Sequence, residues 1–128
     1  MSRHVLTIDL KDDGAAIAEY RAHHRRVWPE VVRSLRRVGV TDMAIHILGR
    51  RVVMVVETQD NLDYKRVFAA HVASDPRVAE WERLMKGLQQ PAPGAAPGEW
   101  WAPMEPVFDL STDDQPAEAP GTDRVRRA

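Results

Sequence analysis

The sequence predicts an α+β sandwich with the ferredoxin-like element order β-α-β-β-α-β. Segments in which apolar residues recur at every second position alternate with segments in which they recur at every third or fourth position. Glycine and proline mark most of the boundaries between these segments. This order predicts a four-stranded antiparallel sheet with the helices packed on one of its faces.

Length and composition limit both the fold and the function. The chain has 128 residues, of which 44% are hydrophobic, and this suffices for one domain with a buried core. Its 18 Lys and Arg residues against 19 Asp and Glu residues disfavour binding to a nucleic-acid backbone. It has no cysteine, no apolar run near the ~20 residues of a membrane span and no signal-peptide core. We therefore expect a cytoplasmic protein that binds neither nucleic acid nor membrane.

The first third of the chain predicts one strand and one interrupted helix. Residues 4–10 alternate between apolar and polar side chains, which is typical of a strand with one buried face. A helical spacing of apolar residues then runs from Ala15 to Val38. Pro29 lies inside this pattern and is expected to kink or divide the helix, because proline clashes with the preceding turn. Gly39 is a suitable residue for the helix end.

The middle of the chain predicts a β-hairpin. Thr41–Leu48 alternates, and the turn at Gly49 separates it from Arg51–Thr58. The second of these strands contains the continuous apolar run VVMVV at residues 52–56. Such a run predicts a central strand that is covered on both faces.

The rest of the domain predicts two more helical segments, a loop and a closing strand. The loop is rich in proline, glycine and alanine, and the region after the strand lacks apolar periodicity, which is typical of a disordered tail. We thus expect one domain over residues 1–110 and a tail over 111–128. The expected elements are the helices 62–73 and 76–88, the loop 91–98 and the strand Trp100–Leu110.

A sheet with helices on only one side leaves its other face bare in a single copy. That face has to be buried against something, and a second copy of the chain is the simplest candidate. We therefore expect a homodimer in which two sheets face each other, the arrangement of a dimeric α/β barrel.

The densest group of functional side chains lies in residues 19–30, EYRAHHRRVWPE. Tyr20, His24 and Trp28 are spaced four residues apart, so they share one stripe of a helix that overlaps its apolar face. This stripe has two interpretations. It forms a small polar pocket in which His24 acts as acid and base, Tyr20 donates a hydrogen bond and Trp28 is an apolar wall. Alternatively, His24 is a core histidine packed between two aromatic rings.

Other histidines and tryptophans are weaker candidates. His23 and His24 are adjacent, do not converge on a helix and are not spaced as metal ligands. His46 faces either solvent or a cavity between two sheets. Trp100 and Trp101 are adjacent on the expected last strand, so their rings should point to opposite faces. The chain has no phosphate-binding loop and no nucleophile elbow, so we expect neither a nucleotide nor a covalent intermediate.

Residues 19–30 also resemble the N-terminal signature of the L-rhamnose mutarotase family, E-Y-x-x-x-H-x-x-x-W-P-E. The resemblance spans residues 3 to 110 and continues through Ala44-Ile45-His46, Trp81–Met85 and Met104–Leu110. It implies a dimeric ferredoxin-like fold, an acid/base role for His24, and sugar contacts from Tyr20 and Trp81.

The chain departs from the rhamnose enzymes at several positions. Glu82 stands where the second member of a tryptophan pair is expected, and Met43 and His46 stand where tyrosines are expected. At these positions the chain resembles the family members known as L-fucose mutarotases. Those members share the patterns V-x-E-W-E-x-L-M and G-x-W-W, here at residues 78–85 and 98–101.

Mutarotation moves one proton off the anomeric hydroxyl and one onto the ring oxygen, and an imidazole with a pKa near ~6.5 suits both transfers. The first hypothesis is therefore a mutarotase of a 6-deoxy-L-hexose, L-fucose preferred and L-rhamnose next. A cofactor-independent monooxygenase of the dimeric α/β-barrel type and a non-catalytic dimeric ligand-binding module are the alternatives. The predicted site has no metal and no cofactor. It contains catalytic His24 and the substrate contacts Tyr20, Trp28, His46, Trp81 and Trp101.

Overall fold

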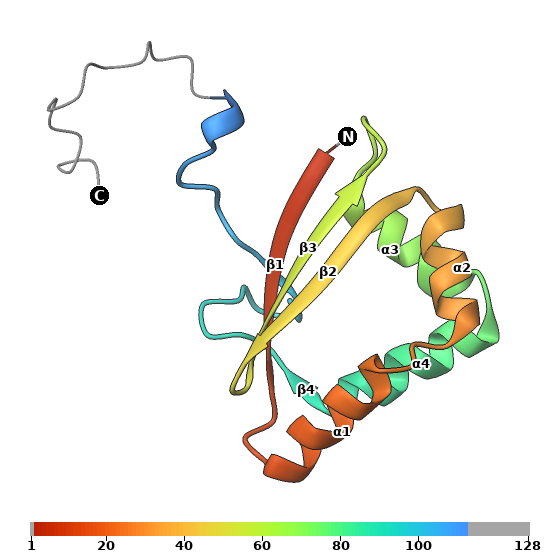
Figure 1. The fold of residues 1–128 in the computed structure, drawn as a ribbon, viewed down its shortest axis with the longest axis vertical. Helices are drawn as coiled ribbons and strands as arrows, with labels where there is room; N and C mark the ends of the chain where they lie inside the picture. Colours follow the sequence, from red (N-terminus) through yellow and green to blue (C-terminus); the bar gives the residue numbers. More distant parts are fainter. Residues whose placement is uncertain (1, 113–128) are drawn as a thin grey trace, which may run out of the picture.

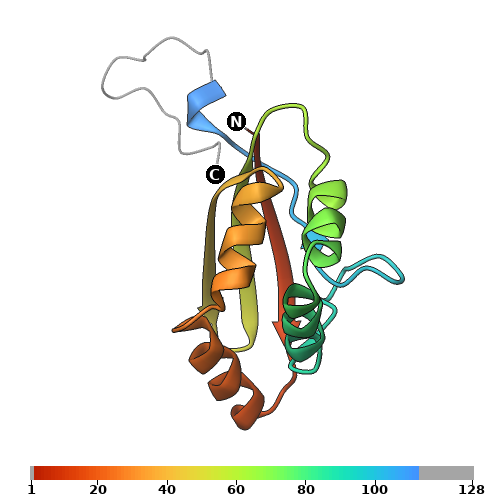
Figure 2. The same cartoon turned by 90° about the vertical axis from the view of Figure 1, so that its right-hand side faces the viewer.

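The computed structural model describes residues 2–112, which form two layers (Figure 1). One layer is an antiparallel sheet in the order β2-β3-β1-β4, and the short strand β5 also pairs with β1. The four helices of this region lie together on one side of the sheet (Figure 2). The strands are β1 (Ser2–Leu10), β2 (Val40–Leu48), β3 (Arg51–Thr58), β4 (Gln89–Gln90) and β5 (Ala102–Pro103). The helices are α1 (Gly14–His24), α2 (Pro29–Arg37), α3 (Tyr64–Ala73) and α4 (Pro76–Lys86).

Local sequence explains where the helices begin and end. Pro29 is the first residue of α2, so the predicted division of the long helix is confirmed. Proline is favoured at this position because its missing N–H would have no partner inside the helix. Aspartates cap the other helices: Asp13 and Asp63 each accept a backbone hydrogen bond of 3.0 Å at α1 and α3, and Asp75 accepts one of 2.8 Å at α4.

The core lies between the sheet and the helices. Side chains at alternate positions of β3 point toward the helices and are buried, whereas their neighbours are half-buried on the other face. In β1 every residue from Leu6 to Leu10 is buried. The core side chains with almost no exposure include Ile8 and Leu10 of β1, Val52 and Val56 of β3, and Val78 of α4. Each such side chain contributes about 1.5–3 kcal/mol by leaving water.

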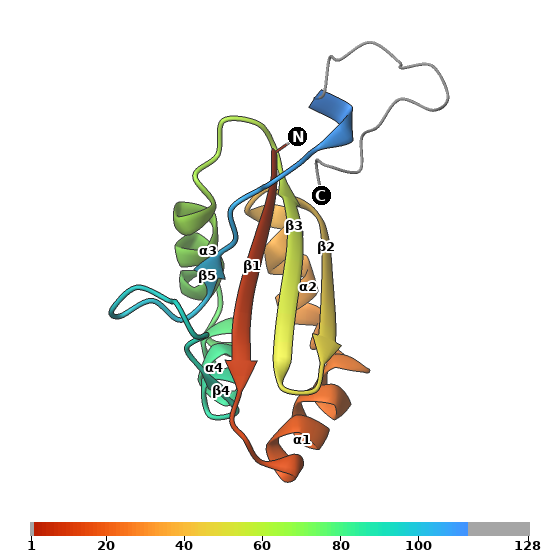
Figure 3. The ribbon, with the colours of Figure 1, turned by 90° about the vertical axis from the view of Figure 1, so that its left-hand side faces the viewer.

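The central strand is covered on one face only, so the expectation of two covered faces is wrong for a single chain. β3 does lie between β2 and β1. Its burial nevertheless alternates, and Val53 and Val55 are only half-buried on the face that no helix covers. Figure 3 shows this open face of the sheet. The continuous apolar run therefore reflects a strand with hydrophobic side chains on both faces, one of which is open.

The predicted closing strand Trp100–Leu110 is also wrong in its extent. Only Ala102–Pro103 pairs with β1, opposite Thr7 and Leu6. The end of β1 pairs instead with Gln89–Gln90, which the sequence pattern did not predict as a strand. Two short segments therefore share one edge of β1, and Pro103 and Pro106 supply no N–H with which to extend a ladder. The chain ends its described part in a 3-10 turn at Leu110–Thr112, and the predicted tail beyond residue 112 lies outside the described residues.

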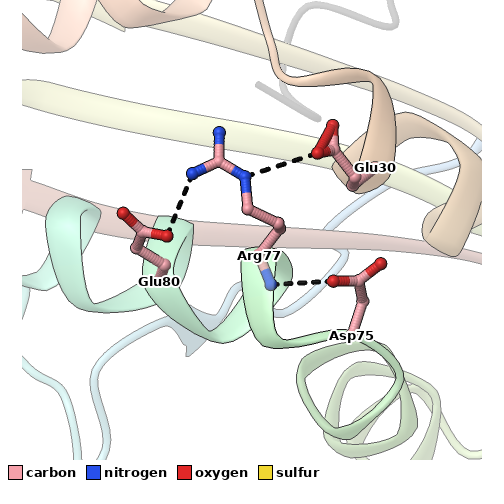
Figure 4. A network of polar contacts seen from close by, with 4 residues as sticks. All are labelled: Glu30, Asp75, Arg77 and Glu80. Atoms are coloured by element: carbon pink, nitrogen blue, oxygen red, sulfur yellow. Dashed lines mark hydrogen bonds and ion pairs between the residues drawn. The ribbon is translucent and has the colours of Figure 1, made fainter.

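An exposed polar cluster joins the start of α2 to the start of α4 (Figure 4). Arg77 on α4 contacts Glu30 on α2 at 3.3 Å and Glu80 on its own helix at 3.0 Å. The guanidinium carbon of Arg77 also lies 3.8 Å from the centre of the Trp28 ring, a cation–π arrangement. These contacts hold Trp28 against α4, which carries the tryptophan described below. Within residues 2–112 no helix is long and apolar enough to cross a membrane.

Gly39 gives a test of the link between α2 and β2. Its φ of +109° is rare for residues with a side chain, and an added Cβ would lie 2.6 Å from Leu62 Cδ1. We expect Gly39→Ala to lower the free energy of unfolding by about 1–3 kcal/mol in urea denaturation. Gly14→Ala is the matched control because its Cβ would meet nothing within 4 Å, and its effect should stay within about 0.5 kcal/mol. Equal losses in both variants would contradict this account of Gly39.

Candidate active site

A cavity of about 730 Å³ lies between the sheet and the helices. All four helices and strands β1 to β4 contribute to its walls, which are mostly apolar. A group of polar side chains interrupts this apolar lining. Tyr20 and His24 come from α1, Glu82 comes from α4 and Gln89 comes from β4. These side chains make up the candidate site.

His24 is the last residue of α1, and one hydrogen bond fixes its ring. Its Nδ1 lies 2.8 Å from the backbone carbonyl oxygen of Tyr20. A carbonyl oxygen only accepts, so Nδ1 carries the hydrogen and donates it. In the neutral ring, Nε2 then keeps its lone pair, and it has no hydrogen-bond partner among residues 2–112. The geometry thus presents a proton acceptor at the cavity.

Aromatic rings surround this imidazole. The Tyr20 ring stacks on it with centroids 4.2 Å apart, and the Trp81 ring meets it edge-on at 5.6 Å. Trp81 lines the cavity, while Trp28 packs against Trp81 at 5.1 Å without lining the cavity itself. Trp28 therefore supports the wall from behind. The wall is also continued by Trp101, which lines the cavity from the segment before β5.

Burial sets the protonation states of the site. It lowers the pKa of His24, an effect that the hydrogen bond to Tyr20 opposes and the neighbouring His23 increases. Burial raises the pKa of Tyr20 to about 12, with a hydrogen bond from Gln89 opposing the rise and the negative charge of Glu82 adding to it. The site therefore combines an imidazole that is neutral at physiological pH with a phenol that keeps its proton.

Four of the residues predicted from the sequence meet at this cavity: Tyr20, His24, Trp81 and Trp101. His46 does not. It is exposed on β2, in phase with the side chains on the sheet face that no helix covers. The strand period of two places it opposite Met43 and Ile45, which do line the cavity.

The prediction that strand alternation turns Trp100 and Trp101 to opposite faces is wrong, because neither residue belongs to a strand. Strand alternation does not apply to them, and both rings pack against the same core cluster. Trp100 also lies beside Lys86, whose ammonium nitrogen is 5.7 Å from the ring centre.

Sequence reasoning missed Glu82 and Gln89 as site residues. A signal for Glu82 was present: Val78, Trp81, Glu82 and Met85 share one helical stripe by their spacing, so a carboxylate interrupts an apolar face. Gln89 gave no comparable signal, because its position depends on the unpredicted strand β4.

Two solved structures share this fold. The L-rhamnose mutarotase from Formosa agariphila has a TM-score of 0.61 at 21% identity, over 86% of this chain and 99% of that one. The tetracenomycin F2 cyclase from Streptomyces glaucescens, a type-II polyketide cyclase, has a TM-score of 0.51 at 14% identity, over 85% and 96%. These likenesses confirm the predicted class of α+β fold.

Sequence comparison narrows this class to one family. The L-rhamnose mutarotase family model matches residues 3–110. The L-fucose mutarotase of Xanthomonas campestris is 42% identical over 113 residues, which cover 87% of this chain and 90% of that protein. The chain belongs to the L-rhamnose mutarotase family and is a sugar mutarotase, an isomerase that acts at the anomeric carbon. The predicted family and enzyme class are confirmed.

The ring geometry of His24 predicts its tautomer. Long-range ¹H–¹⁵N correlation spectra should show the neutral ring protonated at Nδ1 and unprotonated at Nε2, because Nδ1 donates to Tyr20. The same spectra recorded across pH should give a pKa below the usual ~6.5, because burial disfavours the charged ring. The His24→Ala spectrum assigns the signal. A ring protonated at Nε2, or a pKa above the usual value, would contradict the geometry.

Proposed function

We propose that the substrate is a 6-deoxy-L-hexose, L-fucose preferred and L-rhamnose next, and that His24 is the acid/base residue. The observation that carries this proposal is the free Nε2 of His24 at an aromatic-walled cavity. The 42% identity to the L-fucose mutarotase of Xanthomonas campestris supports the order of the two sugars. The alternatives of a monooxygenase and a binding module receive no support from the family match.

The mostly apolar wall favours a deoxy sugar. A 6-deoxyhexose carries a methyl group where an ordinary hexose carries a hydroxymethyl group, and burying a hydroxyl without a partner costs about 1–3 kcal/mol. We propose that Trp81 and Trp101 contact the apolar face of the pyranose and that Tyr20 donates a hydrogen bond to a sugar oxygen. Trp28 does not contact the sugar in this proposal and instead holds Trp81 in place.

In the proposed reaction, Nε2 of His24 accepts the proton of the anomeric hydroxyl. The O–H electron pair becomes the second bond of the C1 carbonyl, the bond from C1 to the ring oxygen breaks, and a proton is delivered to the ring oxygen. Rotation about C1–C2 exposes the other face of the carbonyl, and the reverse transfers close the ring as the other anomer. The reaction has no net oxidation or reduction, so its chemistry requires proton transfer alone.

We also propose that the protein is a homodimer that buries the open face of the sheet. Val53 and Val55 lie on this face and are half-buried in one chain. Leu48 at the hairpin end is 84% exposed, and Val107 in the C-terminal segment is 98% exposed. Large apolar side chains exposed in this way favour a surface that is covered by a partner. Light scattering on the purified protein measures the mass directly, and one chain per particle would exclude the dimer.

Anomer exchange provides the test of the proposed activity. The wild-type protein should accelerate exchange between the anomers of L-fucose, and of L-rhamnose less strongly, in saturation-transfer NMR. His24→Ala should lower the catalysed rate by about 10²–10⁴-fold, the usual contribution of one acid/base group.

His23→Ala is the matched control. His23 is the neighbouring histidine, pairs with Glu19 at 3.3 Å and does not line the cavity. This variant should retain most of the exchange rate. Absence of acceleration by the wild type with either sugar would refute the proposed substrates, and equal losses in the two variants would refute the role of His24.

A further inference from the structure

We propose that Glu82 is the second proton carrier, the group that exchanges a proton with the ring oxygen while His24 exchanges one with the anomeric oxygen. This inference rests on the proposed function and extends it, because ring opening moves two protons and His24 accounts for one of them.

Position is the first observation in favour of Glu82. It follows Trp81 on α4 and lines the same cavity as His24 and Tyr20. Glu82 is half-buried, on a helical stripe shared with Val78 and Met85, where an apolar residue would otherwise pack. A carboxylate placed on such a stripe needs a reason, because burying a charge is costly unless it is compensated.

The second observation is that Glu82 is not used in holding the fold together. Among residues 2–112, its carboxylate accepts no hydrogen bond within 3.5 Å and pairs with no cation within 4.0 Å. Other glutamates do have structural partners: Glu19 pairs with His23, Glu30 and Glu80 pair with Arg77, and Glu99 accepts a backbone hydrogen bond. Glu82 is thus available to a ligand in the cavity.

Its surroundings suit proton transfer. Burial raises the pKa of Glu82, and the positive charge of Lys86, one turn further along α4, opposes the rise. Tyr20 faces Glu82 from α1, and its pKa of about 12 makes it a poor proton carrier at neutral pH. Gln89 has no titratable proton. The other titratable groups of the wall are Arg36 on α2, Asp42 on β2, and Tyr64, Lys65 and His71 on α3.

His24 and Glu82 together account for both protons that move when the sugar ring opens and closes. Neutral His24 takes the proton from the anomeric hydroxyl at Nε2, and the carbonyl of C1 forms. The protonated carboxyl of Glu82 gives its proton to the ring oxygen as the bond from C1 to that oxygen breaks. An imidazolium and a carboxylate remain, so the total charge of the site is unchanged. After rotation about C1–C2, the carboxylate takes the proton back from the ring-oxygen hydroxyl, the imidazolium returns its proton to the anomeric oxygen, and the ring closes.

The test compares Glu82→Gln with Glu19→Gln in the anomer-exchange assay with L-fucose. Glutamine keeps the size of the side chain and removes its titratable proton. Glu19 on α1 is exposed, pairs with His23 and does not line the cavity, so the control removes a carboxyl group outside the site. We expect Glu82→Gln to lower kcat/KM by about 10²-fold or more, and Glu19→Gln to remain near the wild type.

The pH profile separates a proton carrier from a residue that only shapes the cavity. The wild type should show a bell-shaped profile of kcat/KM with two limbs, from His24 and Glu82. Glu82→Gln should keep one limb only, and Glu82→Asp, which retains a carboxyl, should keep both limbs and recover part of the rate.

Three outcomes would overturn the proposal: an unchanged rate in Glu82→Gln, a reduced rate with both limbs still present, or an Asp variant as slow as the Gln variant with a single limb. The proposed function fails differently, because in that case the wild type itself gives no acceleration. Thermal unfolding curves of the variants confirm that each is folded when it is assayed.

Discussion

The hydrogen bond of 2.8 Å from His24 Nδ1 to the Tyr20 carbonyl oxygen is the interaction on which the site depends. It determines which ring nitrogen carries the proton and which one is free to act as a base. The bond exists because the two residues are four apart and His24 is the last residue of α1. The division of the helix before Pro29 therefore places this imidazole at an end of a helix, beside a cavity.

Burial in the apolar cavity shifts the pKa values of the site residues. Burial lowers the pKa of the His24 imidazole and raises the pKa of the Glu82 carboxyl, so the two values move toward each other. The lowered pKa keeps the His24 imidazole neutral, as a base must be, and the raised pKa of Glu82 brings its carboxyl closer to the range in which it can hold and release a proton near neutral pH. The same burial keeps Tyr20 protonated, as a hydrogen-bond donor that does not compete for the transferred proton.

Local patterns in the sequence predicted much of the fold, and long-range pairing limited the rest. The strand and helix periods, the division at Pro29 and the hairpin at Gly49 are properties of neighbouring residues. The stripe of Tyr20 and His24 is equally local and was found for that reason. The two short strands on the edge of β1 depend on contacts across the whole chain. Gln89 and the placement of Trp101 follow from those strands. His46 was predicted as a site residue from the resemblance to the family. Its position in the alternation of β2 instead places it on the sheet face opposite the cavity.

A structure with bound L-fucose tests the central claim most directly, because it shows where the anomeric carbon lies. We predict that the pyranose lies in the cavity between the sheet and the helices. Its anomeric oxygen should lie about 2.6–3.2 Å from His24 Nε2, with the Trp81 ring against the sugar. The sugar bound elsewhere, or bound in the cavity with its anomeric oxygen turned away from His24, would contradict the account.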